Sequence, residues 1–202
     1  MTMTTTRNPD QTRANLLDAA FEELYEHGFQ GMRVDDVLER AGLKKGAFYH
    51  HFESKQELGY AVLDEVIQRF MSARWVEGMA KAEDPIPALE DVIDNMVASA
   101  PPDKPFCGCP LNNLAQEMAP LDEGFQARIA QAFEGWIGVV TEAFARGQDH
   151  GTIRKGIDPH GVAMFVVAAV EGCVGLTKAS QDPETFTRCR EQLSGYLGTL
   201  RP

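Results

Sequence analysis

The sequence predicts an all-α protein of about nine helices, and three observations support this fold class. Apolar residues recur every three or four positions in most segments, which is the helical period. An Asp or Asn followed by Pro stands before several of these segments, where the first residue caps a helix and proline fits its first turn. No strand-like alternation of apolar and polar residues persists along the chain.

Composition narrows the class of protein further. The 202 residues are 44% apolar, enough for a core, and carry a net charge of −11. The densest positive window of the N-terminal part lies at residues 40–55, where Arg40, Lys44, Lys45 and Lys55 face only Glu53. Because the distribution of charge matters more than its sum, the acidic total does not exclude a nucleic-acid partner.

Targeting features and cysteine usage favour a cytoplasmic protein with no membrane span. The first residues lack the apolar segment of a secretory signal. The strongest apolar run, residues 162–176, contains Glu171 and is shorter than the roughly 18 residues that a membrane helix needs. Four cysteines should stay mostly reduced in the cytosol. Cys107 and Cys109 have poor spacing for zinc, and we expect no metal or other cofactor.

The first fifty residues have the pattern of a helix-turn-helix unit. A helix is predicted from about residue 9 to His27, where Gly28 ends it. A second begins near Val34, and Ala41-Gly42-Leu43 turns the chain into a third helix over residues 45–52. The third helix buries Phe48 and Phe52 and is expected to enter the major groove as the recognition helix.

A long fourth helix is predicted from the capping box Ser54-Lys55-Gln56-Glu57 to about residue 81. Lys55 at its first position opposes the helix dipole, and a DNA phosphate at this helix N-terminus would remove that conflict.

The remaining chain is predicted to form five further helices, separated by a Pro-rich break at residues 100–105. They begin at Asp84-Pro85, near Leu111, before Phe125, at Asp158-Pro159 and at Asp182-Pro183, and Gly147 and Gly151 are expected to end the seventh. The eighth is apolar all round, so it must be covered on all sides. We expect helices eight and nine to form a four-helix homodimer interface, the alternative being an internal core helix.

Residues 9–58 resemble the DNA-binding domain of the tetracycline-repressor (TetR) family. The resemblance rests on the run from Val34 to Val37, the run from Ala41 to Phe52, and the run from Ser54 to Leu58. It implies a DNA-binding domain at 1–53 and a ligand-binding and dimerisation domain at 54–202, with release from a palindromic operator when a small-molecule effector binds.

The same resemblance places a defined set of residues at the DNA. They are Lys44, Lys45, Gly46, Ala47, Tyr49, His50 and Lys55. Arg33 and Lys44 stand where the family usually has a Ser or Thr cap, so both add a cation beside the expected phosphates. Tyr49 as a packing residue, Lys45 as an ordinary surface charge and His51 as a structural residue remain alternatives.

A ligand pocket is implied among helices four to seven, although most such side chains are expected to be plain core. Its candidates by residue type are Phe70, Trp75, Met96, Phe106, Leu111, Met118, Phe133, Trp136 and Phe165. Glu171 interrupts an apolar run, and it can bind a polar ligand group, pair across a dimer or reach solvent. Reaching solvent is the expectation we favour.

The stretch from Phe106 to Met118 resembles the Gly-Cys-containing entry to the sixth helix in a TetR branch that includes sensors of electrophiles and oxidants. Cys107 or Cys109 near a helix N-terminus would have a lowered pKa and a more reactive thiolate. Pro110 favours Cys109 for this position. The alternative is that both cysteines are small buried fillers.

A DNA-binding repressor is therefore the predicted function. The alternatives are a helical adaptor that has lost DNA binding and a small-molecule-binding protein. An enzyme is not indicated, because no phosphate-binding loop, nucleophile elbow or metal-spaced cluster occurs in the sequence.

Overall fold

The computed structural model describes residues 8–98 and 105–202. Every regular element in these ranges is a helix, which confirms the all-α fold class. With the contiguous elements over residues 55–79 counted as one helix, the helices there number nine, as predicted. The chain divides into two compact units, one of residues up to 68 with 113–129, the other of 69–112 with 130–202. The predicted Pro-rich break lies, apart from Pro105, outside the described residues.

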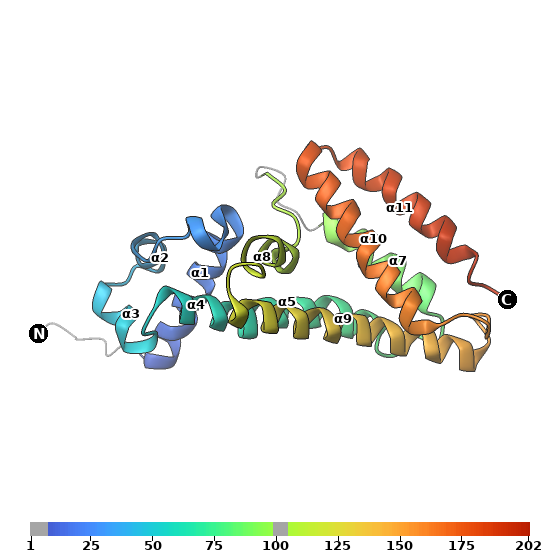
Figure 1. Cartoon of the computed structure of the whole chain (residues 1–202), viewed down its shortest axis with the longest axis horizontal. Helices are drawn as coiled ribbons and strands as arrows, with labels where there is room; N and C mark the ends of the chain where they lie inside the picture. The colour runs from blue at the N-terminus through green and yellow to red at the C-terminus, as the bar shows by residue number, and fades with distance from the viewer. Residues whose placement is uncertain (1–7, 99–104) are drawn as a thin grey trace, which may run out of the picture. The chain divides into compact units, whose positions relative to one another are not determined.

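The first unit contains the predicted helix-turn-helix segment (Figure 1). Its helices are α1 (Pro9–Gly31), α2 (Val34–Ala41), α3 (Lys45–His51), α4 (Lys55–Ala61) with its continuation η1 (Val62–Ile67), most of α8 (Pro110–Met118) and the start of α9 (Glu123–His150). Its core consists of buried apolar side chains, among them Leu16, Ala20, Leu24, Val37, Phe48, Phe52, Leu58, Val62 and Phe125. Apolar residues that recur every three or four positions in the sequence therefore lie on one face of each helix and pack in this core.

α1 is broken at Gly28, where the sequence predicts its end. Gly28 has φ +75°, a left-handed conformation that glycine adopts without a steric penalty. A Cβ at this position would lie 2.9 Å from a carboxylate oxygen of Glu117, so a larger residue would also displace this carboxylate.

The predicted long fourth helix is continuous over residues 55–79, but it is not uniformly α-helical. After η1 it runs through α5 (Gln68–Met71), the second π-helical stretch η2 (Ser72–Val76) and α6 (Glu77–Met79). π-helical turns are rare and often mark functional positions in helices. Sequence periodicity does not reveal them, because they change the register by a single residue.

The second unit is built around α7 (Pro85–Ala98), most of α9, α10 (Pro159–Ser180) and α11 (Pro183–Gly198). Asp84, Asp158 and Asp182 each accept a hydrogen bond from a backbone N–H two residues on, which confirms the predicted caps. Figure 1 shows α10 and α11 packed side by side. The buried side chains include Trp75, Met79, Leu89, Ile93, Trp136, Phe144, Val166, Leu193 and Leu197.

One predicted helix stop is wrong. Gly147 lies inside α9, and the helix ends near Gly151, which has φ +73°. A Cβ at Gly147 would come within 2.7 Å of both Ile153 and Pro85. This glycine therefore allows a close approach between segments of the second unit and does not end the helix.

α10 is long and apolar enough to cross a membrane by length and composition, although half of its most apolar stretch is buried in the unit. The expectation that it is covered on all sides does not hold within one chain. Gly161, Phe165, Ala168, Gly172 and Leu176 recur every three or four residues and are all exposed. α10 thus presents one stripe of small and apolar side chains that its own chain leaves uncovered.

Candidate functional site

α2, the turn at Gly42 and α3 form the first candidate site. Gly42 has φ +63°, and the N–H groups of Gly42 and Leu43 return to carbonyls near the end of α2. The C-terminal cap of α2 is therefore closed by the backbone, and the chain enters α3 directly. Phe48 in α3 and Phe52 directly after it are both buried, which anchors one face of α3 in the domain core.

The opposite face of this motif is open to solvent. The predicted contact residues Arg33, Lys44, Lys45, Gly46, Tyr49 and His50 are exposed, and Ala47 is half-buried. Tyr49 is 59% exposed, although its ring meets Phe48 edge-on at 5.1 Å. Packing against Phe48 therefore accounts for only part of the Tyr49 side chain, and most of it remains exposed.

Two of these cations stand at helix N-caps. Arg33 precedes α2 and Lys44 precedes α3, both in extended conformation and both without a side-chain hydrogen bond to the helix. Their positions leave backbone N–H groups of the first turn without a side-chain cap. Such a helix N-terminus, with a cation beside it, is suited to a phosphate.

Two other residues of the positive window are engaged within the domain. The Arg40 guanidinium contacts the carboxylates of Glu23 and Glu26 at 2.8 Å, so it neutralises buried acid. His51 is half-buried against His50 and Phe52, and burial with the nearby cationic groups lowers its pKa. These contacts favour the structural interpretation of His51.

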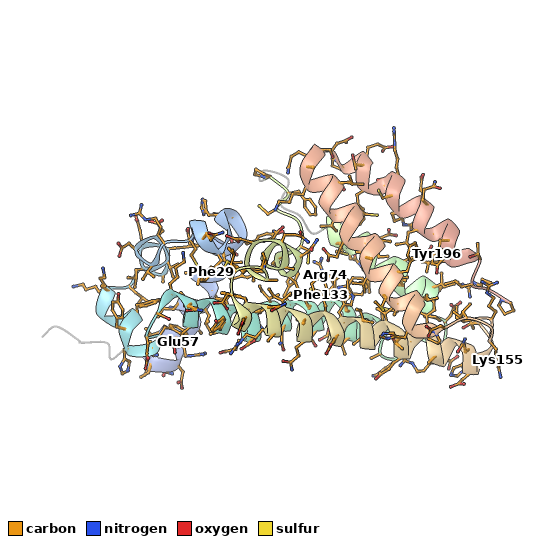
Figure 2. The ribbon with its side chains drawn as sticks, in the orientation of Figure 1. Phe29, Glu57, Arg74, Phe133, Lys155 and Tyr196 are labelled. Carbon is orange, nitrogen blue, oxygen red and sulfur yellow. The ribbon has the colours of Figure 1, made fainter. Side chains whose placement is uncertain are left out.

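Lys55 also has partners inside the first unit. Its Nζ donates to the carbonyl of Gln30 at 3.1 Å and lies 4.8 Å from the centre of the Phe29 ring. Burial lowers the pKa of Lys55, and the charge of Glu117 opposes that shift. Figure 2 labels Phe29 in this cluster. Sequence reasoning missed Glu117, because nothing in its local pattern indicates that it reaches the end of α1.

The predicted pocket residues are mostly packed. Trp75, Leu111, Met118 and Trp136 are buried, whereas Met96, Phe106 and Phe133 are half-buried. The rings of Trp75 and Trp136 lie 4.6 Å apart, and neither indole N–H has a hydrogen-bond partner among the described residues. Phe165 belongs to the exposed stripe of α10 and meets the ring of Tyr196 on α11 at 4.8 Å. Figure 2 labels Tyr196 on α11.

The second unit also contains a groove of about 730 Å³ between the helical stretch 70–78 and α7. Phe70, Ala73, Arg74, Gly78, Ala88, Asp91, Val92 and Asn95 line it. The Arg74 guanidinium lies over the Phe70 ring at 4.7 Å. Its volume falls in the range of small-molecule sites. Among the predicted pocket residues, Phe70 is the one that lines this groove.

The expectation that Glu171 reaches solvent is wrong. Its side chain is 8% exposed, because α10 directs it into the second unit. The Cys109 thiol and the Asn112 amide are near enough to affect its pKa, yet neither carboxylate oxygen forms an aligned hydrogen bond with any described residue. Burial raises the pKa of Glu171.

The expected lowered pKa of Cys109 is also wrong. Cys109 is 7% exposed, and burial and the neighbouring Glu171 raise the pKa of its thiol. Backbone N–H groups of Leu111 and Asn112, at the start of α8, oppose that shift but do not overcome it. Cys107 is half-buried, and its thiol donates to the Pro105 carbonyl at 3.5 Å.

The helix-turn-helix unit joined to a larger helical unit defines a DNA-binding transcriptional regulator. Residues 16–62 match the family model described as bacterial regulatory proteins of the tetR family, and residues 85–193, more than half of the chain, match the tetracyclin repressor-like C-terminal domain. The chain belongs to the tetR family.

Relatives extend the match over most of the chain. The transcriptional repressor DhaR of a Mycobacterium species is 27% identical over 179 residues, which cover 85% of each chain. The transcriptional repressor NemR of Escherichia coli is 25% identical over 93% of this chain and 94% of its own. A TetR regulator from Chloroflexus aurantiacus has the same fold, with 25% identity, a TM-score of 0.84 and coverage of 96% of this chain and 97% of its own.

Proposed function

We propose that the chain is a homodimeric repressor that binds a palindromic operator and leaves it when a small molecule or a thiol-reactive compound reaches the second unit. The observation that carries this proposal is the exposed surface of α3 and its preceding turn. Cationic and aromatic side chains project from it while Phe48 holds the opposite face in the core. Two relatives that match over most of their length are named as repressors, which supports repression instead of activation.

The proposed DNA-binding domain comprises residues 1–53. Lys45, Gly46, Ala47, Tyr49 and His50 would meet the major groove, because the N-terminal part of a recognition helix faces the base edges. Arg33 and Lys44 would bind phosphates at the N-termini of α2 and α3. For Lys55 we propose a smaller contribution, since its ammonium is already held by Gln30 and Phe29.

The proposed dimer forms through the exposed stripe of α10 together with α11. Gly161, Ala168 and Gly172 allow a close approach of a second helix, and Phe165 and Leu176 supply apolar area. A two-fold symmetric dimer suits a palindromic operator, because its two recognition helices then meet equivalent half-sites about 34–36 Å apart.

Effector sensing would belong to residues 54–202, in the cytoplasm and without catalytic turnover. The groove beside Phe70 and the buried region around Cys109 are the two sites we propose for effectors. The helix over residues 55–79 and α9 each run through both compact units, so a change in one unit has a covalent path to the other. An effector that distinguishes the two states by about 1–3 kcal/mol is enough for regulation.

Operator binding tests the proposal directly. A fluorescent fragment of the upstream region is titrated with the native chain and with the double variant Lys45→Ala and Tyr49→Ala. The double variant should lose specific binding and stay dimeric by light scattering. The control, Lys155→Ala with Leu121→Ala, removes another exposed lysine and an exposed apolar side chain elsewhere. Unchanged affinity of the Lys45 and Tyr49 variant would reject this DNA-binding surface.

A second titration tests the effector class. The native chain, Cys107→Ser and Cys109→Ser are bound to the operator and exposed to a panel of electrophiles. Release that requires one of the two thiols would support thiol sensing. Release by none of the electrophiles would retain the repressor and direct the search for ligands to the groove beside Phe70.

A further inference from the structure

Glu171 is a buried acid without a conventional partner. Its side chain is 8% exposed on α10, and both carboxylate oxygens lack an aligned hydrogen bond within the described part of the chain. Val167, Val170 and Val174 on the same helix are buried as well, so the residues that flank Glu171 on the inner face of α10 are apolar. Burial of an unpaired carboxylate is costly, and native proteins seldom retain such a group without a use for it.

The group beside this acid is a thiol. Cys109 lies immediately before α8, is 7% exposed, and its thiol is close enough to Glu171 for each to influence the other. Asn112, in the first turn of α8, also acts on the carboxylate. The backbone N–H groups of Leu111 and Asn112 favour the anionic form of the sulfur.

In the resting protein this thiol carries its proton. Burial and the adjacent carboxylate both raise the pKa of Cys109, and the two N–H groups oppose them only in part. Because the thiolate is the nucleophile, a thiol in this environment would be inert by itself. Any reaction at Cys109 therefore needs a base that removes the proton as the new bond forms.

We propose that Glu171 is the general base that accepts the Cys109 proton when the thiol adds to a small α,β-unsaturated carbonyl compound. This inference rests on the proposed function, since it specifies the chemistry of thiol sensing. The sulfur forms a bond to the β-carbon, and the carbon–carbon π electrons move to the α-carbon and carbonyl oxygen. The thiol proton passes to a Glu171 oxygen and is then delivered to the α-carbon. No oxidant or reductant is consumed.

The site is arranged for this step. A buried carboxylate is a stronger base than a solvated one, because burial raises its pKa toward that of the thiol. The N–H groups of Leu111 and Asn112 stabilise the negative charge that develops on sulfur. Cys109 and Asn112 are the side chains that affect the pKa of Glu171, so the pH at which Glu171 loses its proton depends on these two neighbours.

The product would form at the N-terminus of α8. The same helix carries Glu117, whose carboxylate holds the backbone of Phe29 and Gln30 after the break in α1. An adduct at Cys109 would therefore act on a helix that also stabilises the proposed DNA-binding domain.

Peptide-resolved alkylation kinetics test the role of Glu171. The full-length native chain and Glu171→Gln are treated with methyl vinyl ketone, and mass spectrometry follows each of the four cysteines. Glu171→Gln should slow alkylation of Cys109 about a hundred-fold at neutral pH, the lower range for general base catalysis. Rates at Cys107, Cys173 and Cys189 should stay within twofold, which makes these cysteines internal controls.

A purely electrostatic role for Glu171 predicts the opposite change in the alkylation rate of Cys109. If Glu171 only repels the thiolate, then removing its charge lowers the pKa of Cys109 and Glu171→Gln reacts faster. An equal or faster rate in this variant, or no modification of Cys109 in the folded native chain, overturns the proposal. Circular dichroism and the melting temperature verify the fold, and Glu171→Asp, which keeps a displaced base, should react at an intermediate rate.

The dependence of the Cys109 alkylation rate on pH distinguishes Glu171 acting as a base from Glu171 acting only as a structural residue. In the native chain the rate at Cys109 should rise as Glu171 loses its proton and then level off, whereas in Glu171→Gln it should rise steadily with the thiolate fraction. Because no DNA is present, this result is independent of the proposed function. If the rate at Cys109 depends on Glu171 but the modified protein stays on the operator, the sensor function is rejected and the role of Glu171 as a base is retained.

Discussion

The carboxylate of Glu117 in α8 accepts a hydrogen bond from the backbone N–H of Phe29 at 2.8 Å. A second bond, from the next N–H along the chain, measures 2.7 Å. Both donors follow Gly28, where α1 breaks, so this acid satisfies backbone groups that the break leaves exposed. α8 thereby stabilises the end of the first helix of the proposed DNA-binding domain.

Substitution of Glu117 by Ala should lower the free energy of unfolding by about 2 kcal/mol, because charge-assisted hydrogen bonds contribute about 1.5–3 kcal/mol. Urea unfolding followed by circular dichroism measures the change. Glu134→Gln, which alters an exposed acid in the middle of α9, is the control and should have little effect. Equal stabilities for the two variants would show that the Glu117 bonds contribute nothing net.

Arg40 should be important for stability. Glu23 is 6% exposed and accepts from Arg40 at 2.8 Å, so Arg40→Ala leaves a buried carboxylate without its main cation. We expect a loss of about 3 kcal/mol by urea unfolding. Arg188→Ala removes an exposed pair with Glu184 and should cost less than about 1 kcal/mol. Similar losses for both variants would contradict the buried role of Glu23.

Leu176 on the exposed stripe of α10 tests the dimer. Leu176→Glu places a charge in the proposed interface and should shift the protein to monomers in size-exclusion chromatography with light scattering. Leu121→Glu is a matched control, because Leu121 is 63% exposed and Leu176 57% exposed. A Leu176→Glu variant that remains dimeric at micromolar concentration would place the interface elsewhere.

Lys44 should contribute a phosphate contact and no base preference. Lys44→Ala is expected to weaken binding to operator and to unrelated DNA alike, and to reduce the slope of log affinity against log salt concentration by about 1. Fluorescence anisotropy at several salt concentrations measures both quantities, with Lys155→Ala as the control. A loss confined to operator DNA would instead assign Lys44 to base recognition.

Glu171 should make stability depend on pH. Its folded-state pKa is raised by burial, so the folded chain holds this proton more tightly than the unfolded chain. The stabilising effect of protonation is complete below the ordinary carboxyl value of about 4.3 and is lost as the pH rises through the folded pKa. Relative to the native chain, Glu171→Gln should therefore become more stable as the pH rises toward 8.

Urea unfolding at a series of pH values gives that comparison. A stability difference that stays constant between pH 4 and pH 8 would mean that Glu171 does not titrate differently in the folded chain.

Local rules predicted most of the fold. Asp158 and Asp182 cap their helices as expected, and Gly28 and Gly42 take positive φ where the chain had to turn. Caps, turns and helical periodicity depend on residues within about four positions of one another, so they can be read from sequence. The burial of Phe48 beneath α3 follows from the same periodicity.

The sequence predictions that are wrong or missing concern residues whose neighbours lie far away along the chain. The local pattern predicts Gly147 as a helix stop, but the role of this glycine is set by Ile153 and Pro85. The hydrogen bond from Phe29 to Glu117 spans 88 positions of the chain.

The sequence by itself determined the helices, the helix-turn-helix motif and the family. The tertiary structure decided that Glu171 is buried and that burial and Glu171 raise the pKa of the Cys109 thiol. The physical reason is that a helix propensity is local, whereas desolvation and charge–charge interactions depend on which elements pack around a side chain.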